Sequence, residues 1–526
     1  MEQRIVIKVF KSIDSRNSLV YMSKGDNLLD ALVSSNLTIS NECGGMGTCG
    51  KCMIRLVEGA LDISTQDRNV LSEHELAEGY RLACTAYPDR DCTIMLCSRT
   101  SDDFKVVTET LSYNAIKESS MEVISHSKTF LHEKNSYALA IDLGTTTLAF
   151  AIISLRDGVI IDKYSANNPQ RIYGADVVSR IKSSNEGKLK MLSDLIRKGL
   201  RDGIYALLAK ADTKMSNLEK IIISGNTTMI HLLMEYPCDN LGAYPFKPIN
   251  LGIINTFSDD LIGLNDRIPL MILPGISAFV GGDVTAGLLA CGFYHKEEPC
   301  IFIDLGTNGE IVLGHKDRLF VTSTAAGPAF EGGNILYGVG SIPGAIYNVS
   351  FKNKILSYNT IDNAPPVGLC GTGLIELVSE LLIEGLIDRS GLLVDRYFDS
   401  GYPIAGMKLI QKDIRELQLA KSAIRVGMDI LLKKLGLSYE ELDEVYLAGG
   451  FGYHLDIEKA VMIGLLPEAL MNKVKVVGNA SLSGAIMSLS DSETIKKMQD
   501  IISSAEEVHL SNEDDFNDLF INYLSF

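Results

Sequence analysis

The sequence predicts an α/β protein in which a small cysteine-bearing domain is followed by a larger region built from two similar halves. Two observations carry this prediction. Four cysteines, Cys43, Cys49, Cys52 and Cys84, gather in the first hundred residues around a glycine-rich loop. Beyond residue 135, four local patterns occur twice and in the same order. A chain of 526 residues is long enough for both parts.

The composition excludes several functional classes. The chain is 46% hydrophobic and 22% charged, which is typical of globular domains. Its net charge of −17 argues against wrapping nucleic acid. It contains no uninterrupted apolar run of about 18 residues, which a membrane-spanning helix would need. Ten cysteines in this length do not make a disulfide scaffold, and the N-terminal residues predict a strand rather than a signal peptide.

The loop Cys43-Gly-Gly-Met-Gly-Thr-Cys49-Gly-Lys-Cys52 favours an iron–sulfur cluster. Its glycines allow positive φ and close backbone approach. A loop around a compact inorganic cluster requires both, because its N–H groups must point at sulfur. The cysteine spacing, with a distant fourth at Cys84, is close to the plant-type [2Fe–2S] pattern. Zinc is an alternative, although its sites more often show two Cys-x-x-Cys pairs, and structural thiols are a third possibility.

The elements expected around these cysteines follow a familiar order. An alternating strand at Ile5–Phe10 and a partner at 18–21 precede a helix-periodic stretch at 27–34. A strand follows Cys52, and Cys84 comes later. This order resembles the β-grasp ferredoxin fold, and we assign it to residues 1–98. The loop is one residue longer between Cys43 and Cys49 than the plant-type pattern, which affects loop geometry rather than cluster type.

Residues 99–135 predict a linker module. They are rich in serine, threonine, lysine and glutamate and have few long apolar runs. The sequence is not of low complexity, so we do not expect disorder. A linker here would let the cluster-bearing domain move relative to the remainder.

The region after the linker predicts an internal duplication, with halves at 136–298 and 299–526. Each half has a hairpin with a glycine-containing turn, a long amphipathic helix, a strand that ends in a small-residue loop, and a small-residue turn that opens an apolar helix. Two such halves usually pack face to face and leave a cleft. The paired segments are Tyr137–Thr147 with Cys300–Glu310, Leu189–Leu208 with Gln418–Leu435, Leu218–Asn226 with Leu442–Gly450, and Gly281–Leu289 with Gly478–Met487.

The cleft is expected to hold acids and phosphate-binding turns. Asp142 and Asp304 each end a buried strand just before a glycine turn. Two carboxylates that face each other repel, and a cation between them would relieve this repulsion. The N–H groups of the turns can cradle phosphate oxygens, and the threonine hydroxyls add donors. The candidate phosphate-binding residues are Gly144, Thr145, Thr146, Thr147, Gly306, Thr307 and Asn308.

A glycine-rich loop in the second half offers a surface for a base. The segment Gly449-Gly450-Phe451-Gly452 is nearly free of bulky side chains, so a purine could lie on it. With the two Asp-x-Gly-Thr turns, this loop resembles the superfamily of acetate and sugar kinases, heat-shock chaperones and actin. The resemblance implies a ribonuclease-H-like duplication that binds ATP with Mg²⁺ in the cleft and opens and closes with nucleotide state.

Five further residues are less specific candidates. Glu331, in a glycine-rich loop with Gly327, either places the attacking water near the γ-phosphate or belongs to a structural turn. Asp283 follows two glycines and is expected to cap a helix, with water or metal positioning as the alternative. In the superfamily a helix at 418–435 lines the adenosine, so we expect Lys421 and Ser422 to contact it unless this face is solvated.

The order of a ferredoxin-like domain, a linker and a duplicated ATPase resembles the reductive activators of corrinoid proteins. The resemblance covers essentially the whole chain. It implies ATP-dependent transfer of one electron from the [2Fe–2S] cluster to inactive Co(II) corrinoid on a partner protein, which regenerates Co(I) for methyl transfer. It also implies a low-potential electron donor, a homodimer and work in the cytoplasm of an anaerobe. It rests on the cysteine loop, Asn168-Pro-Gln170, Gly225-Asn-Thr-Thr, Asp304–Glu310 and Leu447–Gly452.

Other functions stay open at this point. A small-molecule kinase with a redox-sensing ferredoxin domain would need an acidic base, for which Asp283 and Glu331 are candidates. A nucleotide-gated chaperone for a metalloprotein would load its partner without electron transfer. An activator of a radical dehydratase would hold its cluster between two subunits with few cysteines, which does not match a separate four-cysteine domain.

Overall fold

The structure is a computed structural model that describes residues 4–10, 18–35, 37, 39, 45, 47, 50, 52–97, 136–352, 355–449, 455–489 and 492–526. The chain divides into two compact units. The first contains Met1–Asp103, Asn168–Gly199 and His231–Lys247, and the second contains Phe104–Asn167, Leu200–Ile230 and Pro248–Phe526. The predicted linker module at 99–135 lies outside the described residues.

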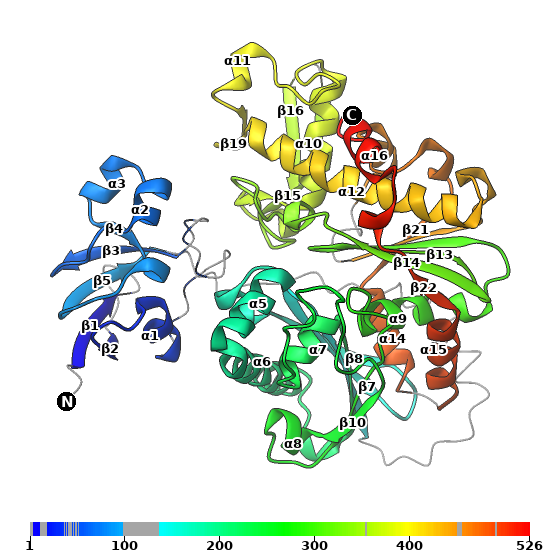
Figure 1. Ribbon diagram of the computed structural model, residues 1–526, viewed down its shortest axis with the longest axis horizontal. Helices are drawn as coiled ribbons and strands as arrows, with labels where there is room; N and C mark the ends of the chain where they lie inside the picture. The colour runs from blue at the N-terminus through cyan, green and yellow to red at the C-terminus, as the bar shows by residue number, and fades with distance from the viewer. Residues whose placement is uncertain are drawn as a thin grey trace. The chain divides into compact units, whose positions relative to one another are not determined.

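The N-terminal part of the first unit is a five-stranded sheet with the strand order β2-β1-β5-β3-β4 (Figure 1). β1 pairs antiparallel with β2 and parallel with β5, and β3 pairs antiparallel with β4 and β5. This mixed sheet with helix α1 against its core confirms the predicted β-grasp fold. The elements are β1 (Arg4–Phe10), β2 (Ser18–Ser23), α1 (Leu28–Ser34), β3 (Met53–Glu58), α2 (Thr65–Val70), α3 (Glu73–Ala77), β4 (Tyr80–Leu82) and β5 (Cys92–Leu96).

Alternation and capping explain this part of the fold. β1 buries Ile5, Ile7 and Val9 because successive strand residues point to opposite faces. α1 begins after Asn27, whose side-chain oxygen accepts a hydrogen bond from the Leu29 N–H at 3.0 Å. The strands and the helix predicted between residues 5 and 58 are present, with their ends moved by one or two residues.

The remainder of the first unit combines helices with the stretch His231–Lys247, which has no helix or strand after residue 233. It contains η2 (Pro169–Tyr173), α5 (Val177–Ser183), η3 (Ser184–Lys188) and the first part of α6 (Leu189–Lys210). Asp176 begins α5 by accepting a hydrogen bond from the Ser179 N–H at 2.7 Å.

The second unit is built on two six-stranded sheets in which five strands repeat one topology, and the sixth strand, β10 or β22, lies at opposite edges. Their orders are β10-β11-β9-β6-β7-β8 and β21-β20-β12-β13-β14-β22. In each, the first strand (β6 or β12) forms an antiparallel hairpin with the next strand and pairs parallel with a later one (β9 or β20). The predicted duplication is therefore confirmed. The strands are β6 (Tyr137–Leu143), β7 (Thr147–Ser154), β8 (Ile160–Asn167), β9 (Leu218–Gly225), β10 (Ile254–Phe257), β11 (Pro269–Ile272), β12 (Cys300–Leu305), β13 (Gly309–His315), β14 (Arg318–Thr324), β20 (Val445–Ala448), β21 (Val474–Gly478) and β22 (Ala505–Glu507).

The paired helices also occur in both halves. α6 corresponds to α12 (Gln411–Leu435), which begins before the predicted start at Gln418, and α9 (Gly282–Ala290) corresponds to α14 (Ala480–Met487). α9 and α14 cross closely, because a Cβ added to Gly484 would lie 1.9 Å from the carbonyl oxygen of Ala286. This contact joins the two halves within the second unit.

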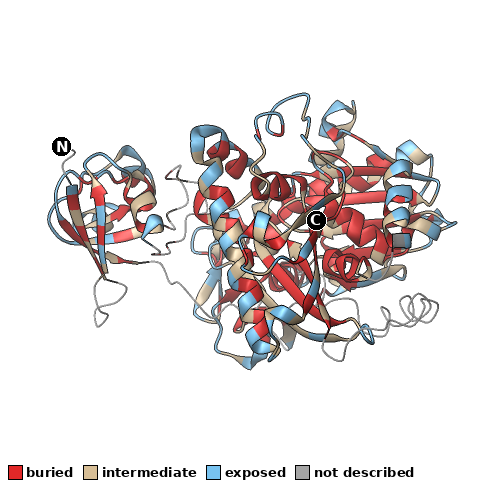
Figure 2. Cartoon of the chain, turned by 90° about the horizontal axis from the view of Figure 1, so that it is seen from below, coloured by how far each residue is buried: buried red, intermediate tan, exposed pale blue. Residues whose placement is uncertain are grey.

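The cores lie on the central strands. Ile221, Ile222 and Ile223 of β9 are all fully buried, although neighbouring strand residues point to opposite faces. Both faces of this strand are therefore covered, as expected for parallel strands in an α/β sheet. Figure 2 shows the buried residues in red along such strands and on the inward helix faces. Among the described residues, we find no helix with both the length and the apolar character needed to cross a bilayer.

The second half carries a further layer around helix α10. A three-stranded sheet with the order β16-β15-β17 and a hairpin of β18 and β19 belong to it. The C-terminal helix α16 lies beside α12 (Figure 1). The remaining helices and strands of the second unit are α7 (Thr227–Leu233), α8 (Ser258–Ile262), β15 (Ala345–Lys352), β16 (Ile355–Thr360), β17 (Gly368–Leu369), α10 (Gly371–Ile383), α11 (Asp395–Phe398), β18 (Tyr402–Ile404), β19 (Met407–Leu409), α13 (Ile457–Met462), α15 (Ser492–Ser504) and α16 (Phe516–Asn522).

Candidate cluster and nucleotide sites

Two of the four predicted cluster ligands lie together in the ferredoxin-like part. Cys52 precedes β3, and Cys84 lies in the short turn η1 (Ala83–Thr85) that follows β4. Because β3 and β4 are paired, the Sγ atoms of Cys52 and Cys84 lie 3.3 Å apart, and both residues are buried. Cys43 and Cys49 lie outside the described residues. Two adjacent buried thiols fit a soft, thiolate-bound metal centre such as an iron–sulfur cluster.

The glycines of the cysteine loop have a backbone role. Gly45, Gly47 and Gly50 have φ values of 90°, 70° and 71°, which side-chain-bearing residues rarely adopt. A Cβ added to Gly47 would lie 2.7 Å from the Cβ of Gln66 in α2. The loop therefore needs glycine both for its conformation and for its close approach to α2.

The two glycine–threonine turns of the second unit are closed by their own hydrogen bonds. The Gly144 N–H donates to the carbonyl oxygen of Thr147, and the Gly306 N–H donates to that of Asn308, both at 3.0 Å. We expected all the turn N–H groups to be available for phosphate. The structure corrects this for the two glycines, and the candidate phosphate donors are the residues that follow them.

Hydroxyl groups from both halves meet at Glu331. Thr307 Oγ1 donates to Glu331 Oε2 at 2.5 Å, and Thr146 Oγ1 donates to the same oxygen at 3.3 Å. Glu331 ends the short helix η6 (Pro328–Glu331), which Gly327 begins with a φ of 74°. The first-half turn, the second-half turn and the Gly327–Glu331 loop, predicted from separate motifs, are thus brought together.

Asp142 is bound by side chains of the other half. Asn479 Nδ2 donates to Asp142 Oδ2 at 2.8 Å, and Ser481 Oγ donates to Oδ1 at 2.7 Å. Asn479 also begins α14, because its Oδ1 accepts a hydrogen bond from the Leu482 N–H. Burial raises the pKa of Asp142, and the two hydrogen bonds act in the opposite direction.

Asp283 is not the helix cap that we expected. Gly281 is the N-cap of α9, and Asp283 lies in the first turn. Gly281 packs against the loop that follows β9, because an added Cβ would lie 2.6 Å from the Cα of Asn226. The chain enters α9 at this glycine. Asp283 holds the second position of α9, as Ser481 does in α14. Burial, with Asp142 nearby, raises the pKa of Asp283 to about 7.

Asp304 and Glu310 complete a cluster of acids. They are cross-strand partners on β12 and β13. Burial raises the pKa of Asp304 to about 8, and repulsion from Asp283, Asp142 and Glu331 adds to it. Burial also raises the pKa of Glu310 well above its ordinary value, with Asp283 and Asp304 adding to it. Half-buried carboxyls that repel one another suit a hard divalent cation with oxygen ligands.

Comparisons with known proteins cover both the part with the cysteine pair and the part with the acid cluster. Three family models match: the 2Fe-2S iron-sulfur cluster binding domain over residues 13–89, the RACo middle region over 137–296, and the C-terminal domain of RACo, the ASKHA domain, over 298–526. A solved structure of a reductive activator for a corrinoid, iron-sulfur protein is 27% identical, with a TM-score of 0.69, and the match covers 99% of this chain and 98% of that one. The chain belongs to the reductive activators of corrinoid proteins.

Two curated relatives of the activator support this assignment. The corrinoid activation enzyme RamQ of Eubacterium limosum is 29% identical over 535 residues, which cover 88% of this chain and 90% of the relative. The [Co(II) methylated amine-specific corrinoid protein] reductase of Methanosarcina barkeri is 25% identical over 424 residues, which cover 74% and 77%.

The expected base-binding loop of the activator begins at a tightly packed glycine. Gly449 has a φ of 102°, and an added Cβ would lie 2.4 Å from the carbonyl oxygen of Leu305 and 3.1 Å from Asp304 Oδ1. Its position next to the acid cluster therefore requires glycine. Gly450 and Phe451 lie outside the described residues.

The α12 face predicted to line the adenosine contacts the C-terminal segment of the activator. Lys421 Nζ donates to the carbonyl oxygen of Ser525 at 2.5 Å, and Ser422 Oγ donates to that of Phe520 at 2.5 Å. Burial lowers the pKa of Lys421 to about 7. The alternative of a solvated face is wrong, because Lys421 and Ser422 are both buried. An adenosine contact here stays a prediction that requires the C-terminal segment to move.

Four residues beside the predicted site residues of the activator were not among the candidates: Asn226, Glu310, Asn479 and Ser481. Asn226 Nδ2 donates to Thr145 Oγ1 at 2.9 Å and so connects the loop after β9 to the first turn. The duplication contained a signal for Ser481. Asp283 and Ser481 hold the same position in the corresponding helices α9 and α14, so a residue-by-residue comparison of the two halves predicts that Ser481 lies near an acid.

The raised pKa values of the acid cluster predict a pH dependence of stability. Asp283 and Asp304 have pKa values of about 7 and 8, above the ordinary value of 3.8. Such groups stabilise the folded chain below the unfolded pKa, and this contribution is lost as pH rises through the folded pKa. In EDTA, we expect the free energy of unfolding to fall by on the order of 2 kcal/mol from pH 6 to pH 8.5.

Denaturant unfolding at the two pH values measures this difference. The Asp304→Asn variant should show a shallower pH dependence, because it lacks one of the titrating groups. An equal slope in both proteins would contradict the prediction.

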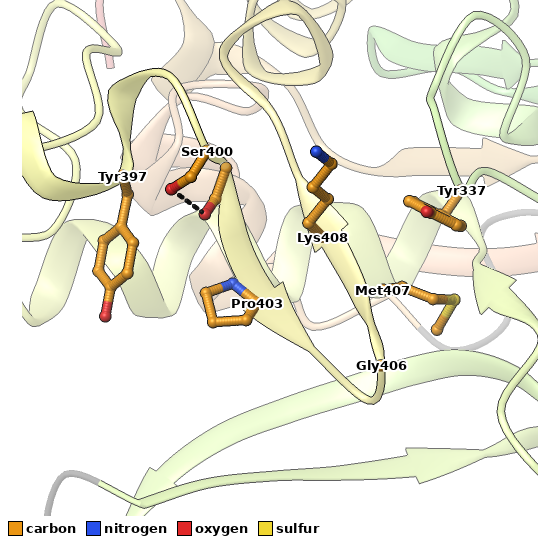
Figure 3. Close-up of a pocket in the computed structure, with 8 residues that line it drawn as sticks. Tyr337, Tyr397, Ser400, Pro403, Gly406, Met407 and Lys408 are labelled. Atoms are coloured by element: carbon orange, nitrogen blue, oxygen red, sulfur yellow. Dashed lines mark hydrogen bonds between the residues drawn. The ribbon is translucent and has the colours of Figure 1, made fainter. Parts of the chain in front are cut away.

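A surface pocket of about 330 Å³ lies away from these residues. Figure 3 shows Tyr397 and Tyr337 on either side of the β18–β19 hairpin, which contributes Pro403, Met407 and Lys408. The pocket has no acidic lining residue and none of the predicted site residues. It is therefore not the site that the sequence predicts for the nucleotide or the metal.

Proposed function

We propose that this activator uses ATP to pass one electron to the Co(II) corrinoid of a partner protein, and so regenerates the Co(I) form that accepts methyl groups. The reduction balances as Co(II) plus one electron to Co(I), with no proton required. One observation carries the proposal: a ferredoxin-like part with the Cys52–Cys84 pair and a duplicated part with interacting carboxyls occur in one chain.

We assign the cluster to the four cysteines of the ferredoxin-like part. Cys52 and Cys84 are buried and adjacent, and Cys43 and Cys49 complete the ligand set by their spacing. When bound, a [2Fe–2S] centre supplies a single electron at low potential. The chain's part in this chemistry is to bury the thiols and to provide a loop that glycine allows to close tightly.

In the cleft, the chain holds phosphates and the attacking water. We assign Mg²⁺ to Asp142, Asp283, Asp304 and Glu310, where it would offset the charge of the carboxyls and of the triphosphate. The phosphates would contact the N–H groups and hydroxyls that follow Gly144 and Gly306. Glu331, whose carboxylate accepts hydrogen bonds from Thr146 and Thr307, would orient the water.

Nucleotide binding would act on both halves at once. The Glu331 contacts and the Asp142 contacts already join residues of the two halves, so a ligand between them favours the closed form. A ligand shifts such an equilibrium only through its differential affinity. ATP must therefore bind the closed, partner-bound form more tightly, and hydrolysis would release the reduced partner before the electron returns.

The test uses the full chain with its cluster, prepared without oxygen. The reduced protein is mixed with a candidate Co(II) corrinoid protein, and the Co(II) EPR signal is followed with ATP and Mg²⁺, with ADP, or with no nucleotide. We expect the signal to disappear with ATP. A phosphorylated small molecule in its place would favour a kinase, and partner loading without electron transfer would favour a chaperone.

Three further features rest on the family resemblance and stay predictions. These are a homodimer, a separate low-potential electron donor and a cytoplasmic location. Sedimentation of the purified chain measures the first, and reduction of the cluster by candidate donors measures the second.

A further inference from the structure

A buried carboxylate lies close to the cysteine pair of the ferredoxin-like part. Asp67, in the first turn of α2, is only 1% exposed. Its Oδ1 accepts a hydrogen bond from the Leu82 N–H at 2.8 Å, and its Oδ2 accepts one from the Ser64 N–H at 2.8 Å. An ionised carboxylate offers acceptors on both oxygens, so both contacts suit it. Asp67 therefore ties the start of α2 to the end of β4.

Leu82 leads directly into the turn that holds Cys84. The Ala83 N–H donates to the carbonyl oxygen of Cys52 at 3.0 Å, so this part of the chain brings the two cysteines together. Within the turn, Asn27 Nδ2 donates to the carbonyl oxygen of Cys84 at 2.9 Å. The backbone is thus held at Leu82 by the carboxylate and at Cys84 by the amide.

The helix that carries Asp67 also packs against the cysteine loop. A Cβ added to Gly47 would lie 2.7 Å from the Cβ of Gln66, and one added to Gly50 would lie 3.1 Å from Cγ1 of Val70. Gln66 and Val70 precede and follow Asp67 in α2. The two hydrogen bonds of the carboxylate therefore connect the helix behind the loop to the strand that leads to the fourth cysteine.

Helix capping alone does not explain why this carboxylate is buried. The next helix, α3, begins with the same arrangement, in which the Ser72 N–H donates to Glu75 Oε2 at 2.8 Å. That hydrogen bond is exposed to solvent. Because a carboxylate loses hydration when it is buried, a cap that forms equally well at the surface gives no reason to place Asp67 inside. The bond to Leu82 is the difference between the two carboxylates.

The charge of Asp67 acts on a metal centre at the adjacent cysteines. The contacts that the structure describes for Asp67 include no lysine or arginine. The buried guanidinium of Arg81 donates instead to the carbonyl oxygens of Leu61 and Leu76. A buried negative charge is weakly screened, so it opposes the addition of an electron to a nearby cluster. Net charge and hydrogen bonding are among the factors that set the reduction potential of such a cluster.

We propose that Asp67 is a positioning residue for the cluster, whose carboxylate holds the Cys84 turn in place and lowers the reduction potential of the bound cluster. The inference rests on the proposed function, because it needs a cluster at the four cysteines. Asp67 is not itself one of the ligands.

The test compares the full chain with two variants, all purified without oxygen. Asp67→Asn keeps the shape of the side chain and removes its charge. Glu75→Gln is the matched control, because it removes a carboxylate from the same kind of cap at an exposed site. A redox titration followed by EPR gives the midpoint potential, and iron and acid-labile sulfide give the cluster content. We expect a shift to higher potential in Asp67→Asn and no shift in Glu75→Gln. An unchanged potential in a fully loaded Asp67→Asn variant would overturn the inference.

A third variant and a second measurement cover the case in which Asp67→Asn loads no cluster. Asp67→Glu keeps the carboxylate and should recover loading, whereas equal loss of the cluster from both variants, with native circular dichroism, would overturn the inference. In the unmodified protein, the Leu82 amide should exchange its hydrogen slowly with and without the cluster, because the carboxylate accepts its hydrogen bond in both states. Rapid exchange of this amide in cluster-free protein, with β1 still protected, would also overturn the inference. Failure of the unmodified protein to bind iron and sulfide would instead overturn the proposed function.

Discussion

Replacing Cys52 or Cys84 by serine should abolish electron transfer to the corrinoid partner. Each substitution removes one of four thiolates from a buried site where the Sγ atoms lie 3.3 Å apart. Changes in the outer shell of a metal site already cost about 10–100-fold, so loss of a ligand should lower the rate by at least about 100-fold. The rate of Co(II) loss by EPR, with iron and acid-labile sulfide content, measures the effect.

The control for this prediction is Cys97→Ser. Cys97 lies just after β5 in the same sheet and is half-buried, but it does not belong to the predicted ligand set. The iron and sulfide content of the Cys97→Ser variant should match that of the unmodified protein. ATP hydrolysis should persist in all three variants, because the acid cluster belongs to the second unit. Full iron content in Cys52→Ser would refute the assignment of this ligand.

Replacing Asp304 by asparagine should abolish ATP-driven activity while leaving the fold intact. Asp304 lies where Asp142, Asp283 and Glu331 all repel it, so a neutral amide relieves repulsion in the protein without metal. The same change removes a carboxylate from the expected cation site. Loss of one preorganised electrostatic contact in an active site typically lowers kcat by about 100–1,000-fold. ATP hydrolysis, titrated with Mg²⁺, measures the loss.

Asp317→Asn provides the matched control. Asp317 lies in the turn between β13 and β14, and its side chain is 73% exposed. The Asp317→Asn variant should hydrolyse ATP at the rate of the unmodified protein. If Asp304→Asn also kept that rate at every Mg²⁺ concentration, the assignment of the acid cluster to the cation would be wrong. The cluster spectrum should be unchanged in both variants.

Local spacing was sufficient to predict the ferredoxin-like part. Strand alternation at Ile5–Phe10, helical periodicity at 27–34 and the glycines around Cys49 each act within a few residues of the chain. The same holds for the hairpins at Asp142 and Asp304, whose turns depend on adjacent glycines. Such features are determined by backbone conformation and periodicity, and the structure agrees with the predicted elements to within a few residues.

Contacts between distant segments could not be predicted from local spacing. Asp142 and Ser481 are 339 residues apart, and their hydrogen bond exists only because α9 and α14 pack across the two halves. Asp283 lies in the first turn of α9 and not at its cap, because the chain enters the helix at Gly281, which packs against Asn226. The partners of Lys421 lie about a hundred residues further along the chain, in a C-terminal segment whose sequence shows no sign of where it binds.

The sequence by itself determined the two kinds of site, since residue types and their spacing specify a thiolate cluster and a pair of phosphate-binding turns. Only the tertiary structure decided which acids lie near one another. The physical reason is that burial and repulsion depend on distance in space. The raised pKa values of Asp304 and Glu310 arise from neighbours that the folding of the two halves brings to them.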